Sequence, residues 1–395
     1  MKLSEVCLNI VDCPHSTAPD EGSGYALVRT PNIGKGRFNL EGVHRISEAA
    51  YKKRCARITP TVNDLILARE APAGNVAIIK ENMEPLALGQ RTVLIRPNPE
   101  KVCPDFLVYY LLAPQQQNEL LGRATGATVA HVNIPIINNL PVSLPPLETQ
   151  QKIAGILSAY DDLTENNRNQ IKLLEEAAQK LYKEWFVKLN FPGHENVKIV
   201  DGVPEGWSFE RIDSFIELLN GFAFKSDSFD DEGKYGIITI KNVQDGAFDS
   251  ANVNRVKEVP SKMPDWCNLE IGDILLSLTG NVGRVCLVTS ENCLLNQRVA
   301  KLKSEYPAYT YTLFRSKDMF IMMNNLANGA AQQNLSPIRT GEQKILKPTQ
   351  EVISAFENLV SPYIKKELSL FIQIQLLQSA RDKLLPKLMN GEFEV

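Results

Sequence analysis

An internal repeat constrains this chain most: a long variable segment followed by a helical segment occurs twice. Residues 144–150 read LPPLETQ and residues 346–351 read LKPTQE, and Pro145 and Pro348 are 203 residues apart. Solenoid repeats are only about 20 to 50 residues long, whereas a repeat of this length holds a globular domain and a helical arm. The sequence therefore predicts two similar halves with an approximate two-fold relation.

Shorter matches occur in the same order along both halves. They are the Asp-apolar strands at 64–69 and 273–279, the Gly-Asn turns at 74–75 and 280–281, the Gln-Arg pairs at 90–91 and 297–298, and the Gly-Ala pairs at 126–127 and 329–330. Such strands and turns are common in β-rich domains, which is the alternative explanation. Their shared order favours duplication.

The segment after each variable region has helical spacing. Apolar residues step by threes and fours at Ile171, Leu174, Ala178, Leu181 and Trp185. The stepping is similar at Leu370, Ile374, Leu377, Leu384 and Leu388, with one step of seven. A narrow apolar seam suits pairing with a second helix, and a two-fold relation makes the pair antiparallel. Alternatively, each seam packs on its own domain. The positions of Asp161-Asp162 and Pro362 predict that each arm breaks into a short and a long helix.

Composition indicates a soluble, cytoplasmic protein. Hydrophobic residues make up 44% of the 395 residues, and the sequence contains no apolar run of about 18 residues. The seven cysteines form no C-x-x-C pair, which suits a reducing compartment. Cys7, Cys13 and His15 come nearest to a metal set but lack a further ligand, so we expect no metal site.

Basic residues are concentrated in one stretch, although the net charge is −3. Residues 29–57 contain eight basic and two acidic side chains. Affinity for DNA comes largely from neutralised phosphates, so this stretch is a candidate DNA-facing surface. A solvated basic face is the alternative.

Motifs for common enzyme chemistry are missing. The sequence has no phosphate-binding G-x-x-x-x-G-K-[ST] loop, no G-x-G-x-x-G turn and no G-x-S-x-G elbow beside any of its four histidines. It also lacks the Asn-Pro-Pro-Tyr and Asp-Pro-Pro-Tyr tetrapeptides of nucleotide methyltransferases. We therefore expect a binding protein with no catalytic residues and no cofactor of its own.

The helical segments resemble one known family. Residues 144–153 (LPPLETQQKI) with residues 174–186, and the C-terminal residues 382–392 (DKLLPKLMNGE), are similar to the central and distal conserved regions of the specificity subunits of Type I restriction-modification systems. The resemblance covers the whole chain. It implies an α+β protein with α/β target recognition domains at 1–146 and 191–347, and helical regions at 147–190 and 348–395 that form an antiparallel coiled coil.

The resemblance also implies a function. Each recognition domain would read one half of a bipartite DNA target, and the helices would fix the spacing and dock two methylation subunits. Those subunits would bring S-adenosylmethionine, and restriction subunits would bring ATP and magnesium. This chain would supply recognition without chemistry. The coiled-coil and partner contacts would involve Ile171, Leu174, Leu181, Trp185, Leu370, Ile374, Leu377 and Leu384.

Base readout requires forked or paired donors and acceptors, such as Arg for guanine and Asn or Gln for adenine. By position in the repeat, the DNA-binding candidates in the first domain are Arg29, Asn32, Lys35, Arg69, Gln90, Arg91, Thr128 and His131. In the second domain they are Lys241, Asn242, Thr279, Asn281, Gln297, Arg298, Gln332 and Gln333. For each of them, the alternative is a loop residue satisfied by its own backbone.

Two other functions compete. A structural scaffold would bind partners through its helices without sequence-dependent DNA binding. A fused enzyme subunit with an unrecognised active site would methylate or cut DNA by itself. The internal repeat with two different domain sequences favours a reader of an asymmetric, two-part target.

Overall fold

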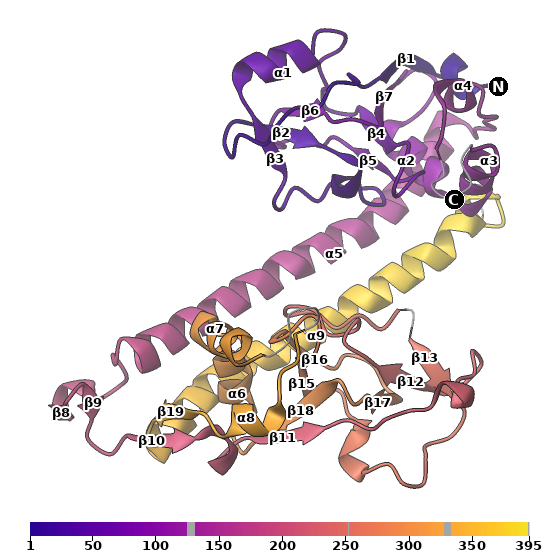
Figure 1. Cartoon of the computed structure of the whole chain (residues 1–395). Helices are drawn as coiled ribbons and strands as arrows, with labels where there is room; N and C mark the ends of the chain where they lie inside the picture. Colours follow the sequence, from indigo (N-terminus) through magenta and orange to yellow (C-terminus); the bar gives the residue numbers. More distant parts are fainter. Residues whose placement is uncertain (125–130, 252, 328–332, 394) are drawn as a thin grey trace. The chain divides into compact units, whose positions relative to one another are not determined.

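The computed structural model describes residues 1–124, 131–251, 253–327, 333–393 and 395, and the chain forms two compact units (Figure 1). Unit 1 comprises Met1–Thr164 and Leu376–Val395, and unit 2 comprises Glu165–Gln375. The long helices α5 (Leu147–Tyr182) and α9 (Gln350–Met389) each contribute a part to both units.

Unit 1 contains an antiparallel sheet of four strands in the order β1-β7-β4-β5, and a three-stranded sheet, β3-β2-β6, in which β2 and β6 are parallel. The strands are β1 (Cys7–Asp12), β2 (Tyr25–Val28), β3 (His44–Ile46), β4 (Leu65–Ala68), β5 (Val76–Ile78), β6 (Leu86–Leu88) and β7 (Thr92–Pro97). The shorter helices are α1 (Glu48–Arg54), α2 (Pro104–Leu112), α3 (Pro114–Gly122) and α4 (Ile134–Asn138).

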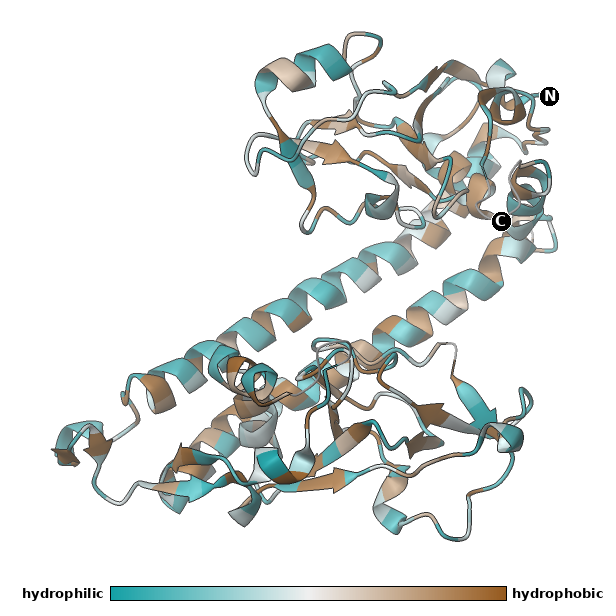
Figure 2. Ribbon diagram, viewed as in Figure 1, coloured by the Kyte–Doolittle hydropathy of each residue, from teal (hydrophilic) through white to brown (hydrophobic). Residues whose placement is uncertain are grey.

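Strand β4 shows why these residues fold as they do. Leu65 and Leu67 enter the core that includes α2, while Ile66 and Ala68 enter the core that includes β2 and β6. A strand covered on both faces reads as a continuous apolar run instead of an alternating one. The run LILA is therefore buried at every position, and the polar residues that follow it mark the strand's end. Figure 2 shows the hydrophobic residues gathered in the strands.

Unit 2 repeats this plan. Its main sheet has the order β11-β18-β15-β16, and its second sheet has the order β13-β12-β17-β14, with β12 and β17 parallel. The strands are β11 (Glu217–Asn220), β12 (Tyr235–Ile238), β13 (Asn254–Val256), β14 (Asn268–Leu269), β15 (Ile274–Ser277), β16 (Val285–Leu287), β17 (Cys293–Leu295) and β18 (Val299–Lys303). The helices are α6 (Pro307–Phe314), α7 (Lys317–Leu326) and α8 (Pro337–Gly341). Smaller pairs are formed by β8 (Ile199–Val200) with β9 (Val203–Pro204), and by β10 (Ser208–Arg211) with β19 (Lys344–Lys347).

The register of the two main sheets is also the same. Leu65 lies opposite Ile95 in unit 1, and Ile274 lies opposite Leu302 in unit 2. These are the strands that the sequence matched at 64–69 with 273–279. The predicted duplication is confirmed at the level of strand order and pairing.

In unit 1, the first part of α5 packs against the last part of α9. Ile153 and Leu157 of α5 join the same core cluster as Leu385 and Leu388 of α9. Further along α5, the buried Asp161 accepts a hydrogen bond of 2.5 Å from Arg381 and one of 2.6 Å from the Tyr109 hydroxyl. Residue numbers rise along α5 while they fall along α9, so the two segments run antiparallel.

Unit 2 pairs the remaining parts of the same helices. Ile171, Leu370 and Ile374 form a small buried cluster, and Asn167 donates to Gln373 over 3.4 Å. Trp185, in the helical turn that follows α5, packs on Phe356 of α9 with ring centroids 5.6 Å apart. The order is again antiparallel.

The predicted break in each arm is wrong. Helix α5 continues through Asp161, and α9 continues through Pro362. The Asp161 carboxylate stays in a regular helix because Arg381 and Tyr109 satisfy it. A proline inside a helix costs about 3 kcal/mol, but fully buried Phe356 and Val360 anchor the turns just before it.

A buried carboxyl lies where α9 meets α6 in unit 2. The Glu367 side chain accepts a hydrogen bond of 3.1 Å from the Tyr311 hydroxyl, and its second oxygen has no partner in the described residues. Burial raises the pKa of Glu367 to about 7, although the Tyr311 hydrogen bond and the Arg315 charge both act to lower it. Arg315 itself pairs with Glu175 of α5 and with Asp245.

Glu367→Gln should remove a pH dependence from the stability of unit 2. The unfolded carboxyl ionises near pH 4.5 and the folded one near pH 7. The protonated carboxyl therefore makes its full contribution to the free energy of unfolding below pH 4.5, and this contribution is lost as the pH rises through 7. The loss amounts to about 3 kcal/mol. Urea unfolding followed by tryptophan fluorescence reports on unit 2, which holds all three tryptophans. Equal pH profiles for the variant and the parent chain would contradict this assignment.

Candidate nucleic-acid interface

The loops at one end of the main sheet in unit 1 are tied together through their backbones. The amide of Arg69, just after β4, donates to the carbonyl of Arg91, just before β7, over 2.8 Å. The amide of Val132 donates to the carbonyl of Arg69 over 3.0 Å, and that of Cys13 donates to Thr92 over 3.2 Å. Four segments thus meet where β1 and β4 end and β7 begins: those that follow β1 and β4, the one that precedes β7, and the one that contains Val132.

Unit 2 has the same arrangement. The amide of Leu278 donates to Arg298 over 3.0 Å, that of Leu335 to Leu278 over 2.7 Å, and that of Gly221 to Val299 over 3.2 Å. These bonds place Leu278 where unit 1 has Arg69, and Arg298 where it has Arg91. A common backbone frame therefore carries different side chains in the two units.

In unit 1 the frame carries a chain of charged side chains. Arg69, with 8% of its side chain exposed, donates to Asp12 over 2.8 Å and to the carbonyl of Val132 over 2.8 Å. Its other terminal nitrogen lies 2.9 Å from Nε2 of His131. Since Arg69 can only donate there, Nε2 accepts.

The chain of contacts continues to the surface. Because Nε2 of His131 accepts, its Nδ1 donates to Glu70, at 2.5 Å. The second oxygen of Glu70 pairs with the guanidinium of Arg91 over 2.9 Å, and the Arg91 side chain is 62% exposed. Arg69 therefore links neighbouring segments inside unit 1, whereas Arg91 presents its charge to solvent.

In unit 2 the equivalent positions are less charged. Thr279 stands in the place of Glu70, and its hydroxyl donates to the Asn334 side chain over 2.9 Å. Gln297, Arg298 and Gln333 are exposed on the surrounding loops. This end of unit 2 offers amide and guanidinium groups, the side-chain types that read base edges.

Two of the predicted base-reading residues have internal partners instead. The Asn32 side chain accepts from the Arg29 amide at 3.0 Å and donates to Asn39 at 3.2 Å. Asn242 makes the matching pair of bonds, from the Thr239 amide at 2.8 Å and to Asp249 at 2.9 Å. Both asparagines are buried, so their geometry favours a structural clamp over a base contact.

The remaining predicted positions differ in accessibility. Gln90 donates to the His15 carbonyl over 2.6 Å, while Arg29 and Asn281 are half-buried. Lys35 and Lys241 are exposed but follow strands of the second sheets rather than the main-sheet ends. Thr128 and Gln332 lie outside the described residues. The DNA-binding set as a whole stays a prediction.

Sequence reasoning missed three partners of the predicted residues. Asp12 binds Arg69, Glu70 binds His131 and Arg91, and Asn334 binds Thr279, yet none of the three was among the candidates. Glu70 directly follows Arg69 in the sequence, which was the one available signal. The contact between Asp12 and Arg69 joins residues far apart in the chain and depends on sheet pairing.

The helix candidates fall into separate clusters. Ile171, Leu174, Leu370 and Ile374 are brought together in unit 2. Leu181 and Trp185 belong to the larger core of that unit, and Leu384 packs on the core of unit 1. Leu377 is half-buried. Their contribution to partner binding stays a prediction.

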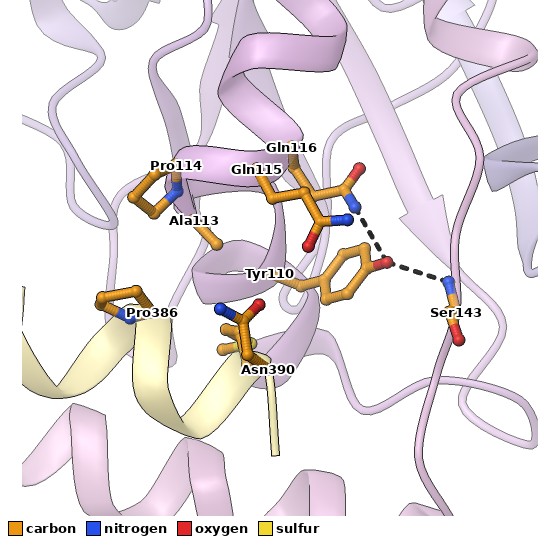
Figure 3. A pocket seen from close by; sticks show the side chains of 9 residues that line it. Tyr110, Ala113, Pro114, Gln115, Gln116, Ser143, Pro386 and Asn390 are labelled. Atoms are coloured by element: carbon orange, nitrogen blue, oxygen red, sulfur yellow. Dashed lines mark hydrogen bonds between the residues drawn. The ribbon is translucent and has the colours of Figure 1, made fainter. Parts of the chain in front are cut away.

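A polar hollow of about 330 Å³ lies beside the end of α9 in unit 1 (Figure 3). The Tyr110 hydroxyl accepts hydrogen bonds from Gln116 at 3.0 Å and from the Ser143 amide at 2.9 Å. Pro386 and Asn390 of the C-terminal segment line the opposite wall. Part of the lining therefore comes from the C-terminal motif, residues 382–392, that the sequence singled out.

The sequence's nearest approach to a metal set has the wrong chemistry for one. Burial raises the pKa of the Cys7 thiol to about 12 and raises the pKa of Cys13 as well, which disfavours the thiolates that bind zinc. Within the described ranges, no three His, Cys, Asp or Glu side chains gather as a metal site would require.

None of the described helices is both long enough and apolar enough to cross a membrane.

Known proteins resemble the chain over nearly its whole length. A family model described as "Type I restriction modification DNA specificity domain" matches residues 1–176 and 204–356. The Type I restriction enzyme MjaIX specificity subunit of Methanocaldococcus jannaschii is 28% identical, over 90% of this chain and 83% of that protein. The HindI specificity subunit of Haemophilus influenzae is 23% identical, over 84% of this chain and 86% of that protein.

A solved structure shares the fold. The crystal structure of the Type-I restriction-modification system S subunit from M. genitalium aligns with a TM-score of 0.58 and 17% identity, over 98% of this chain and 95% of that one. At this identity the likeness establishes the fold alone. The predicted α+β class, with two recognition domains and long helices, is confirmed.

Arg69→Ala should destabilise unit 1 far more than Arg91→Ala. Removing Arg69 deletes a charged hydrogen bond to Asp12 and the hydrogen bond to the buried Val132 carbonyl, at a cost of about 3 kcal/mol. The exposed Arg91 pair is worth less than about 1 kcal/mol. Hydrogen exchange of residues 131–142, which Arg69 ties to β4, measures the difference. Equal protection of this segment in the two variants would contradict the structural role of Arg69.

Proposed function

Because this chain belongs to the Type I restriction modification DNA specificity family, we propose that it is the DNA-recognition subunit of a Type I restriction-modification complex. Each domain reads one half of a bipartite target through the loops at its main-sheet end. The chain has no chemistry of its own, and it acts on DNA in the cytoplasm.

One observation carries this proposal. The same backbone frame occurs in both units, but Arg69, Glu70 and His131 of the first are replaced by Leu278, Thr279 and Asn334 in the second. A duplicated frame with different side chains is suited to two similar DNA segments of different sequence. The target should therefore be asymmetric.

Arg91 and Arg298 are the best candidates for base readout. They occupy equivalent backbone positions, and both are exposed. Arginine forms bidentate hydrogen bonds with O6 and N7 of guanine, which distinguish the correct base by about 1 to 3 kcal/mol. In unit 1 the Glu70 carboxylate holds the Arg91 side chain in place, which reduces the side-chain entropy lost when Arg91 binds a base.

In this proposal, the helices set the spacing of the half-sites and hold the partner subunits. Helix α5 has 36 residues, so it is about 54 Å long at 1.5 Å per residue and suits a ruler between half-sites. Two methylation subunits dock on the helical regions 147–190 and 348–395 and supply S-adenosylmethionine. Restriction subunits supply the ATP- and magnesium-dependent steps. The polar hollow beside Asn390 is a candidate contact for a methylation subunit.

The test is a methylation map. The chain is co-expressed with its cognate methylation subunit in a host without DNA methylation, and N6-methyladenine is located by single-molecule sequencing. We expect one split, asymmetric motif that disappears when the chain is omitted. A stable complex that leaves the genome unmethylated would contradict the proposal, and so would a palindromic motif.

Arg298→Ala should relax one position of one half-site and leave the other half-site unchanged. Lys303→Ala is the matched control, because Lys303 is an exposed cation at the opposite end of β18. At the affected position, the preference for the correct base over the other bases should fall about tenfold, as expected for the loss of a bidentate contact. If the two variants give the same motif, Arg298 does not read a base.

A further inference from the structure

Unit 2 contains an aromatic hollow beside its main-sheet end. It has a volume of about 460 Å³ and is lined by Phe222, Phe224, Lys225, Pro260 and Lys262, among others. Its walls come from the segment that follows β11 and from the loop that follows β13. The volume falls within the range of pockets that hold small organic ring systems.

Two phenylalanines give the hollow its character. The ring centroids of Phe222 and Phe224 are 5.1 Å apart, and the ring planes meet at 80°. In this edge-to-face arrangement the two rings offer surfaces at right angles, and neither ring is fully covered, since both are half-buried. A flat aromatic ligand can therefore stack on one ring while the other closes the side.

The rim of the hollow is mostly basic. Lys225 and Lys262 are both exposed, and neither forms an ion pair with a described carboxylate. Asp227 also lines the hollow, which leaves one net positive charge. The rim thus suits a ligand whose flat ring is attached to anionic groups.

The hollow adjoins the candidate interface. The Phe222 amide donates to Leu295 over 2.9 Å, and the Gln297 amide donates to the Phe222 carbonyl over 3.0 Å. Gln297 in turn precedes Arg298. Any nucleic acid that contacts Arg298 therefore passes close to the two rings.

The hollow distinguishes the two domains. The amides of Cys13 and Gly221 donate equivalent hydrogen bonds to the first residues of β7 and β18, respectively. Pro14 of unit 1 therefore corresponds to Phe222 of unit 2, and Ser16 corresponds to Phe224. Unit 1 thus carries the backbone frame without the aromatic pair. The aromatic pair therefore occurs in the second half of the repeat and not at the equivalent positions of the first.

We propose that this hollow binds one unstacked nucleobase of the bound DNA, with the base stacked on Phe222 or Phe224 and the flanking phosphates held by Lys225 and Lys262. Stacking on an aromatic side chain recovers much of what unstacking a base costs. The inference rests on the proposed DNA recognition and adds that the second half-site is read with a locally distorted duplex.

The experiment uses the complex of this chain with its methylation subunit and target duplexes that carry 2-aminopurine at successive positions of the second half-site. Fluorescence rises where a base leaves the duplex stack. We expect one bright position besides the adenine that the methylation subunit acts on. Phe222→Leu, which keeps an apolar side chain, should abolish that signal, leave the target adenine's signal intact and weaken binding about tenfold.

Two further variants sharpen the test. Replacing Lys225 and Lys262 by alanine should reduce the slope of log affinity against log salt by about two. His15→Ala, between the two equivalent positions Pro14 and Ser16 of unit 1, should change nothing at the second half-site. Tight binding without an extra bright position would overturn this inference while leaving DNA recognition intact, whereas no sequence-specific binding would overturn the proposed function itself. If Phe222→Leu weakens only the binding of the methylation subunit, the hollow takes a protein side chain and the inference is wrong.

Discussion

The burial of β4 and β15 on both faces is the constraint on which the recognition domains depend. Each strand is enclosed by a helix-bearing core on one side and a second sheet on the other, so none of its side chains reaches solvent. Functional side chains can then appear only where the strands end. There the backbone bonds from Arg69 and Leu278 hold three loops together, which gives the variable residues a rigid base.

Much of the architecture was predictable because it follows from local pattern. The repeat, the apolar strands at 64–69 and 273–279 and the seams of α5 and α9 all leave periodic or matched residues in the sequence. The helix breaks were predicted wrongly because local propensity at Pro362 is weaker than the tertiary packing of Phe356 and Val360. Similarly, nothing local shows that Asp161 meets Arg381, 220 residues away.

The candidate site was predicted less well than the fold. Residue type alone singled out Asn32 and Asn242, whose amides turn inward, because sequence cannot show whether a loop satisfies its own backbone. Residue type also made Arg69 and Arg91 equal candidates. Their burial separates them, because Arg69 binds partners inside the protein whereas Arg91 is exposed to solvent. Nothing in the sequence distinguishes the aromatic pair Phe222 and Phe224, because their position beside Gln297 depends on the tertiary fold.

We propose that DNA lies against the main-sheet ends of both units. Site-specific photo-crosslinking tests it directly, with a benzophenone side chain placed at Arg91 or Arg298 and, as controls, at Lys303 and Glu100, which are exposed near the opposite ends of β18 and β7. This placement of DNA predicts crosslinks to target DNA from Arg91 and Arg298 and none from the two controls. Crosslinks from the control positions, with none from the loops, would contradict it.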